Sequence, residues 1–304
     1  RRSRMLLNIL LLLVILLVVR GIARLVRWFL LWLGRGRRLD GAVDMRRINQ
    51  DAVRADIEAE NAAAGVERLT RAQQAEVIAA QLMDRELFLA DLHVGWYQVV
   101  ILFVIGSMAG LVLEELWMLI TAGLTQSRVG LVWGPFSPLY GFGAVLLTLV
   151  SFGLRERGAR DWQVFLASLA LGGALEQLTG WGMQTLFSAE SWTYAHLPDH
   201  ITQWVAWRFL VAWGLLGLVW AKLIMPEALY RIGSPTTRRQ VVFVVLLAAY
   251  LALDILMTVA CFQRRAERDA GIPPLNAFEA WVDVHYTDEF MSNRFQNLVV
   301  GREL

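Results

Sequence analysis

The amino-acid sequence predicts an all-α fold: a polytopic helical membrane bundle with about five core transmembrane helices, an N-terminal anchor helix and a small helical cytoplasmic segment. Three observations lead to this fold class. The 304-residue chain is 57% hydrophobic, more than is usual in soluble domains. Several apolar runs carry at most one or two charges over about 20 residues, the length that spans the hydrocarbon core as a helix. Residues 35–93, by contrast, are rich in Ala, Glu, Asp and Arg.

Residues 1–34 predict an N-terminal membrane anchor. The basic start and the apolar run after it resemble a signal peptide, but no small-residue cleavage site follows, which favours an anchor that stays attached. Arg20, Arg24 and Arg27 lie on one stripe of a helix. This stripe fits either the end of a long spanning helix or an amphipathic helix at the lipid headgroups. We favour the amphipathic helix for residues 20–34, because three arginines inside a membrane are costly.

Residues 35–93 are expected to form one or two amphipathic helices in water. Thr70, followed three residues later by Gln73, has the pattern of a capping box at a helix start. Apolar residues then recur at helical spacing. A solvated structural hairpin explains this segment better than a binding role does.

Five apolar segments predict a transmembrane core domain over residues 94–263, followed by a C-terminal surface tail over residues 264–304. The five segments are residues 96–122, 138–154, 162–187, 202–225 and 240–262. Each is long enough to cross the hydrocarbon core as a helix.

The arginines predict the orientation of these segments. Residues 155–161 and 226–239 are rich in basic side chains, whereas residues 187–201 contain neither Lys nor Arg. The positive-inside rule therefore places the two basic connections in the cytoplasm, and residues 35–93 with them. Residues 123–137 and 187–201 then face outside. Five spans send the C-terminal tail outside too, although three arginines near its start argue against this.

Some ionisable side chains fall inside the predicted spans, where each costs about 2.5–3.5 kcal/mol on insertion scales. Glu114 follows two glycines at four-residue spacing, and Glu176 has a glycine four residues away on each side. Small residues at that spacing let helices approach closely, so both acids are expected on packing faces rather than toward lipid. The ionisable set is Glu114, Glu115, Glu176, Arg208 and Asp254.

The segment LVWGPFSPLYGFG, residues 131–143, combines helix-breaking residues with aromatic ones. Proline cannot donate a backbone hydrogen bond, and glycine permits tight turns and close approach. We expect the segment to fold inward as a re-entrant or capping loop before the next helix begins. The alternative is a plain interfacial turn with an aromatic belt. Its predicted structural residues are Gly130, Gly134, Pro135, Pro138, Gly141 and Gly143.

Four blocks resemble a known family. They are SRVGLVWGPFSPLYGFGAVL, AGLVLEELW, ALEQLTGWGMQTLF and SWTYAHLPDHITQWVAWRFLVAWGLLG. Together they are similar to the signature of the bacterial "putative ABC-transporter type IV permease" family, also called CmpB-like, across residues 96–297. In that resemblance Glu114 and Glu176 stand at the two family acids. Ser127 stands where the family has Asn, and Thr193 stands where it has Asp, which puts any role of that carboxylate in doubt here.

The resemblance implies a permease-like transport subunit in a bacterial cell membrane. The chain contains no G-x-x-x-x-G-K-[ST] nucleotide loop, so an ATP-driven system would need a separate ATP-binding subunit. Besides that subunit, membrane lipids are the expected partners, and neither nucleic acid nor a cofactor is expected. A polar cavity in the outer half of the bundle is the predicted binding site. Its candidate ligand-binding residues are Glu114, Arg128, Tyr140, Glu176, Trp192, Tyr194 and Arg208.

Within this site, we expect Arg128 or Arg208 to neutralise Glu114 or Glu176, and a ligand to compete for that pairing. Two other functions stay open. An integral membrane enzyme acting on lipid or cell-wall substrates could use the His and Asp side chains of HLPDH, residues 196–200. A structural or assembly protein would use the ion pairs for packing alone. We assign no catalytic residue and no metal ligand.

Overall fold

The computed structural model describes residues 50–66, 68–123 and 125–300, together with Arg20, Arg24, Trp28, Phe29 and Trp32. The predicted anchor over residues 1–34 therefore lies almost wholly outside the described residues. The chain divides into two compact units. The first comprises Arg1–His93 and Pro226–Val241, and the second comprises Val94–Met225 and Val242–Leu304.

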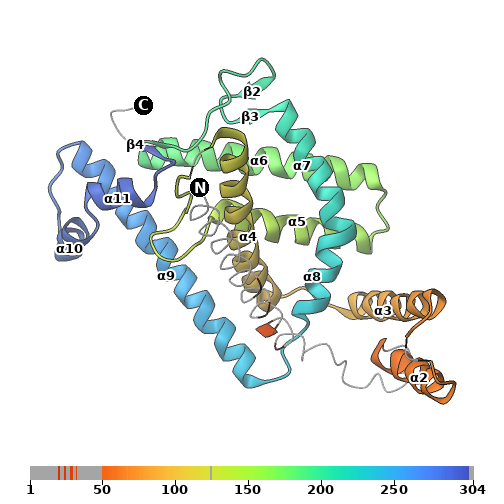
Figure 1. The fold of residues 1–304 in the computed structure, drawn as a ribbon. Helices are drawn as coiled ribbons and strands as arrows, with labels where there is room; N and C mark the ends of the chain where they lie inside the picture. Colours follow the sequence, from red (N-terminus) through yellow and green to blue (C-terminus); the bar gives the residue numbers. More distant parts are fainter. Residues whose placement is uncertain are drawn as a thin grey trace, which may run out of the picture. The chain divides into compact units, whose positions relative to one another are not determined.

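The described elements are almost all helices, which confirms the all-α fold class (Figure 1). The helices are α2 Gln50–Ala63, α3 Arg71–Asp91, α4 Trp96–Ala122, α5 Pro138–Glu156, α6 Asp161–Phe187, α7 Trp207–Val219, the π-helical η3 Trp220–Ile224, α8 Met225–Ile232, α9 Arg238–Asp269, α10 Ala277–His285 and α11 Asp288–Arg294. Four short strands complete the described part: β1 Ala189–Glu190, β2 His200–Thr202, β3 Val205–Ala206 and β4 Val299–Val300.

In the first unit, α2 and α3 form a helical hairpin. The predicted capping box begins α3, because the Thr70 hydroxyl accepts from the Gln73 amide N–H while the Gln73 side chain accepts from the Thr70 N–H. Gln73 also exchanges two side-chain hydrogen bonds with Asn61 of α2. Near its end, α3 packs against α8 through Phe88 and Tyr230, whose rings meet edge to face.

Four of the described helices are long and apolar enough to cross a membrane. They are Trp96–Ala122, Pro138–Glu156, Trp207–Ile232 and Arg238–Asp269. The predicted span over residues 162–187 is not among them, because the Gly, Gln and Thr residues of α6 lower its apolar content. The fourth span begins at Trp207 rather than at residue 202, since β2 and β3 pair antiparallel just before it.

Helix α6 nevertheless runs antiparallel to α7 along its full length. At one end, Asp161 forms an ion pair with Lys222, with 2.5 Å between the carboxylate and the ammonium. Toward the other end, Gln177 and Gln184 hydrogen-bond to Thr202 and Gln203, which lie just before α7. The polar side chains that lower the hydropathy of α6 are therefore used in contacts within the bundle.

Glycines set the close approach of neighbouring helices in the second unit. A Cβ atom added to Gly106 of α4 would lie 2.3 Å from the Cβ of Ala144 in α5, and one added to Gly110 would lie 2.2 Å from the ring of Tyr140. In the α6–α7 hairpin, Gly217 of α7 faces Ser168 in the same way. Small residues thus face the neighbouring helix, as expected for helices that pack without a hydrophobic driving force.

A π-helical turn separates α7 from α8. Pro226 has no N–H and its ring would clash with the carbonyl four residues earlier in a regular helix. The Met225 N–H bonds instead to the carbonyl of Trp220, which widens the turn and lets one continuous helix carry the proline.

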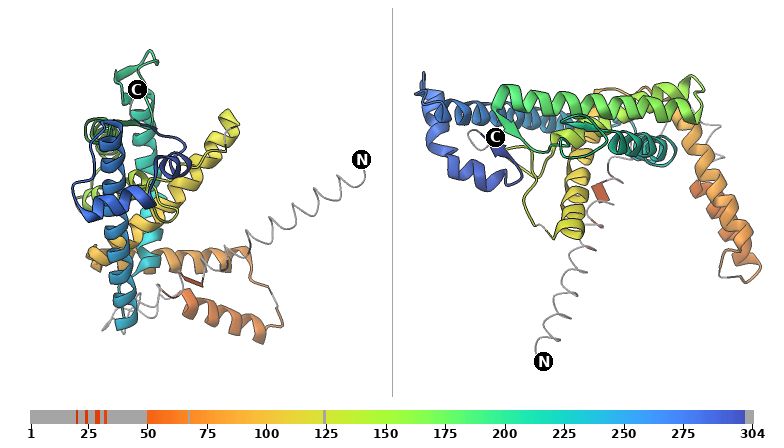
Figure 2. Two further views of the ribbon diagram at one scale, coloured as in Figure 1. Left: turned by 90° about the vertical axis from the view of Figure 1, so that its left-hand side faces the viewer. Right: turned by 90° about the horizontal axis from the view of Figure 1, so that it is seen from above.

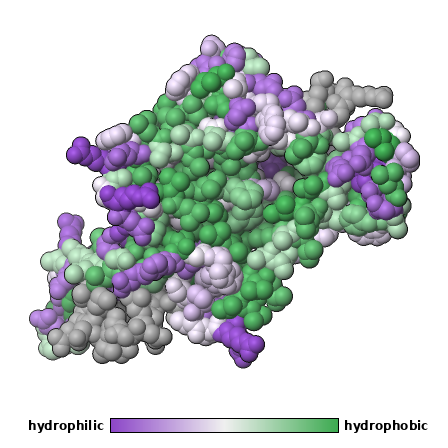
Figure 3. Space-filling model, turned by 180° about the vertical axis from the view of Figure 1, so that it is seen from behind, coloured by the Kyte–Doolittle hydropathy of each residue, from purple (hydrophilic) through white to green (hydrophobic). Residues whose placement is uncertain are grey.

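Large apolar side chains of the spanning helices remain exposed, and they cover a broad area on one face (Figure 3). Such a surface suits contact with lipid tails.

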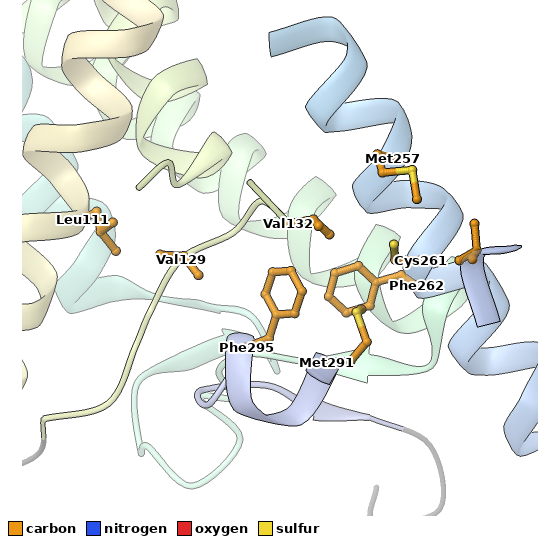
Figure 4. Close-up of a cluster of buried hydrophobic side chains, with 9 residues drawn as sticks. Leu111, Val129, Val132, Met257, Cys261, Phe262, Met291 and Phe295 are labelled. Carbon is orange, nitrogen blue, oxygen red and sulfur yellow. The ribbon is translucent and has the colours of Figure 1, made fainter. Parts of the chain in front are cut away.

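The C-terminal segment packs back onto α9 and onto the loop before α5 (Figures 1 and 2). The Arg264 guanidinium, only 2% exposed, bonds to Asp283 of α10, and Arg268 bonds to Asp283 and to Asp288 of α11. Beyond α11, β4 pairs antiparallel with β1. Figure 4 shows the apolar cluster that these segments enclose, Leu111, Val129, Val132, Met257, Cys261, Phe262, Val282, Met291 and Phe295.

Candidate functional site

The first half of the candidate site is an ion pair between α4 and the loop that follows it. Arg128 Nε lies 2.6 Å from Glu114 Oε1, and both side chains are largely buried. The side chain of Tyr140, two residues into α5, hydrogen-bonds to the same carboxylate. Glu114 is thus held by the loop and by the next helix at once, because the Gly110 face of α4 brings the Tyr140 ring against it.

The second half is Glu176, on the face of α6 that packs against α7. Its side chain is 8% exposed. The indole N–H of Trp213 in α7 donates to Glu176 Oε1 at 2.9 Å. The second oxygen, Oε2, is buried and has no hydrogen-bond partner among the described residues. The Trp213 ring lies over Gly172, where an added Cβ would come within 2.0 Å of it.

Tyr194, in the loop between α6 and α7, connects the two halves. Its ring stacks on Phe209 of α7 with 4.4 Å between centroids, and its backbone N–H donates to the Gln203 carbonyl at 2.6 Å. Burial raises the pKa of its hydroxyl above the usual value, and the negative charges of Glu176 and Glu114 raise it further. Both carboxylates are therefore close enough to act on one phenol.

Two tryptophans of the segment between α6 and α7 contact each other, and one of them packs on α6. The Trp192 indole donates to the Trp204 carbonyl. The Trp204 ring in turn covers Gly180 of α6, one turn from Glu176, where an added Cβ would lie 2.3 Å from the ring. The Trp204 indole nitrogen is buried and also lacks a hydrogen-bond partner among the described residues.

Arg208 does not join the site, which corrects the expectation that it neutralises a membrane acid. It forms an ion pair with Asp199 at 2.6 Å, and its side chain is 51% exposed. The backbone N–H of Arg208 also donates to the Asp199 carboxylate, so this acid caps the start of α7. Hydrogen bonds from Arg208 hold the pKa of Asp199 below its usual range. The pairing that exists in the site is Arg128 with Glu114.

The loop before α5 folds inward and is fixed by α9 and α11. The backbone N–H groups of Val132 and Trp133 donate to the hydroxyl of Thr258 and the carboxylate of Asp254, both at 2.9 Å. From α11, the Arg294 guanidinium donates to the carbonyl oxygens of two further loop residues. The intramembrane acid Asp254 thereby holds the loop backbone through one oxygen, and its second oxygen is buried without a hydrogen-bond partner among the described residues.

The glycines and prolines of that loop have specific positions. Gly134 has a positive φ of 69°, which a residue with a side chain rarely adopts. The Pro138 ring contacts Gly130 so closely that an added Cβ would lie 2.5 Å from it. Gly141 lies against Ser107 and Phe103 of α4. Pro135, in contrast, is exposed at the loop surface.

Three aromatic residues of the site, Trp204, Phe209 and Trp213, lie in a block that resembles the family, but the sequence did not assign them to the site. Their only signal was indirect: glycines flanking an acid leave room that a large ring in a neighbouring helix can fill. The sequence does not say which ring fills it. In the HLPDH segment, Asp199 pairs with Arg208 and the His200 ring bonds to the Leu197 carbonyl. Within the described residues, no three His, Cys, Asp or Glu side chains gather as a metal site.

These features define the class of protein: a polytopic helical membrane protein with a partly buried polar cluster between two helical hairpins. Residues 101–259, slightly more than half of the chain, match the family described as "putative ABC-transporter type IV", or CmpB. The chain belongs to this family of membrane transport-like proteins. No curated protein and no solved structure matches it.

Proposed function

We propose that this protein is the membrane subunit of an ABC-type transport system and that the cluster of Glu114, Arg128, Tyr140, Glu176 and Tyr194 is its ligand-binding site. We call this set the acid cluster. The single observation that carries the proposal is Glu176 Oε2, a carboxylate oxygen that is buried without a partner among the described residues. A buried polar atom normally has a hydrogen-bond partner, and one without it is a site where a ligand can supply the missing bond.

The rest of the acid cluster supports a site that can open. Glu114 is partnered by Arg128, which lies on the loop and not on a spanning helix. A ligand that displaces the guanidinium would therefore need to move the Arg128 side chain and no spanning helix. Removing one partner of a buried ion pair leaves an uncompensated charge, so the ligand must compensate that charge itself.

The proposed topology places the acid cluster near the outer surface of a bacterial cell membrane. The connections 123–137 and 188–206 and the C-terminal segment lie on the same side of the second unit, because Ser127 bonds to Gln296 and Ser191 bonds to Asn297. The positive-inside rule puts that side outside. Residues 35–93 are then cytoplasmic, on the side where a separate ATP-binding subunit would work.

A complementation experiment tests the transport role. A strain that lacks the protein is complemented with the wild type, with Glu176→Gln or with Glu115→Gln, a matched loss of one acid outside the acid cluster. Depletion of solutes from a defined medium is followed by mass spectrometry, with membrane levels of each variant measured by immunoblotting. We expect at least one solute whose uptake is restored by the wild type and by Glu115→Gln and not by Glu176→Gln.

Full restoration by Glu176→Gln would remove the acid cluster from the function. The ATP-binding partner is tested separately, by purifying the protein from native membranes and measuring ATP hydrolysis in the preparation. Absence of any co-purifying ATP-binding polypeptide would argue against an ABC-type system and in favour of a structural or assembly role.

A further inference from the structure

The two acids of the acid cluster have different partners, and this difference limits the charge of the ligand that the cluster can bind. Glu114 has Arg128 as its cationic partner at 2.6 Å. Glu176 has an indole N–H and, among the described residues, no Lys or Arg partner. An indole donates a hydrogen bond without carrying a charge. The described side chains therefore offer the buried acid Glu176 no cation.

One aromatic side chain contacts this acid, and others lie on the segments packed near it. Trp213 donates to it, and Trp204 covers α6 one turn away. Tyr194 lies close enough for the charge of Glu176 to act on its hydroxyl, and its ring stacks on Phe209. The negative faces of aromatic rings attract cations, and an acid with aromatic side chains nearby is suited to an alkylated ammonium group. We name this set, Glu176 with Tyr194, Trp204, Phe209 and Trp213, the aromatic acid site.

The alternatives fit these groups less well. An anionic ligand would be repelled by Glu176 and would find Arg128 already taken by Glu114. A hydrated inorganic cation needs several oxygen ligands, whereas the surrounding side chains offer mainly rings and indole N–H groups. A buried carboxylate with one free oxygen, lined by rings, leaves a compact organic cation as the best match.

We propose that the aromatic acid site binds a small organic cation, with its ammonium group beside Glu176 Oε2 and its alkyl groups against the aromatic rings. This inference rests on the proposed function and names the class of substrate for that site. The Trp204 indole N–H, which has no partner among the described residues, is left to donate a hydrogen bond to a polar group at the other end of such a ligand.

Isothermal titration of the purified full-length protein in nanodiscs tests this inference, with choline as the probe. Its uncharged isostere 3,3-dimethyl-1-butanol has the same shape without the positive charge and serves as the ligand control. We expect choline to bind the wild type and Glu115→Gln. Glu176→Gln should weaken binding about tenfold or more, since a charge-assisted contact is lost.

A second pair of variants keeps the test valid if Glu176→Gln folds poorly. Tyr194→Phe retains the ring and should retain choline binding, whereas Tyr194→Leu removes the ring and should weaken binding about fivefold. No choline binding to the wild type, equal binding by Glu176→Gln, or equal binding of the neutral alcohol would each overturn the inference. If a solute still depends on Glu176 in the complementation experiment, the proposed function stands and only the cationic class is wrong.

Discussion

Replacing Gly172 by Ala tests how the aromatic acid site is built. The added Cβ would lie 2.0 Å from Trp213 Cγ, with two further ring atoms within 2.5 Å, so the indole must shift. Trp213 cannot shift without loosening its hydrogen bond to Glu176. The substitution therefore combines overpacking with the loss of the hydrogen bond that holds a buried carboxylate.

The magnitude follows from three contributions. Overpacking costs about 1–3 kcal/mol, and a hydrogen bond to a charged group contributes about 1.5–3 kcal/mol. Replacing Gly by Ala within a helix stabilises the helix by about 1 kcal/mol, which offsets part of this loss. The expected net loss of stability is about 1.5–5 kcal/mol. Gly182 in the same helix has no atom within 4 Å of an added Cβ, so Gly182→Ala serves as the matched control.

Thermal unfolding of the two variants and the wild type is compared in detergent at one heating rate, because membrane proteins often unfold irreversibly. We expect Gly172→Ala to unfold several degrees below the wild type and Gly182→Ala to unfold at or slightly above it. Equal midpoints for the two variants would refute the argument that Trp213 is wedged against α6. Restoration of the Gly172→Ala midpoint by a smaller ring, Trp213→Phe, would support it further.

Three further predictions concern the loop, the tail and the ion pair. Arg294→Ala leaves two loop carbonyls without their donor and should speed amide hydrogen exchange in the loop before α5, while unchanged exchange would contradict the loop contact. The Arg264 guanidinium holds the pKa of Asp283 below its usual range. The ion pair that joins the tail to α9 is therefore fully present above about pH 4, the usual pKa of Asp. It is lost as the pH falls through the lowered pKa of Asp283 in the folded protein. Protease cleavage of the tail should therefore rise in acid, and Asp283→Asn should be cleaved readily at neutral pH too. Glu114→Gln or Arg128→Gln alone should lower the free energy of unfolding by about 3–5 kcal/mol. The double variant should lose less than the sum of the two single losses. Additive losses in unfolding experiments would mean that the pair is uncoupled.

The sequence by itself determined the class of architecture. Long apolar runs predict helices in a membrane, and the periodic spacing of glycines around Glu114 and Glu176 predicts that these faces meet other helices. It also determined the family, since the Gly-Pro-Tyr-Gly block and the two Glu helices follow each other in a fixed order. Such features are local, because they depend on residues within a few turns of one another. The capping box at Thr70 is another example.

Tertiary structure alone decided which side chains pair. Arg208 was a candidate partner for a membrane acid, but the β2–β3 turn brings Asp199 to it first. Glu176 pairs with Trp213, which the sequence did not assign to the site, because a ring in α7 fills the space that Gly172 leaves. Contacts between helices depend on which faces meet when the chain packs. Residues distant in sequence come together only then, so one-dimensional spacing cannot determine them.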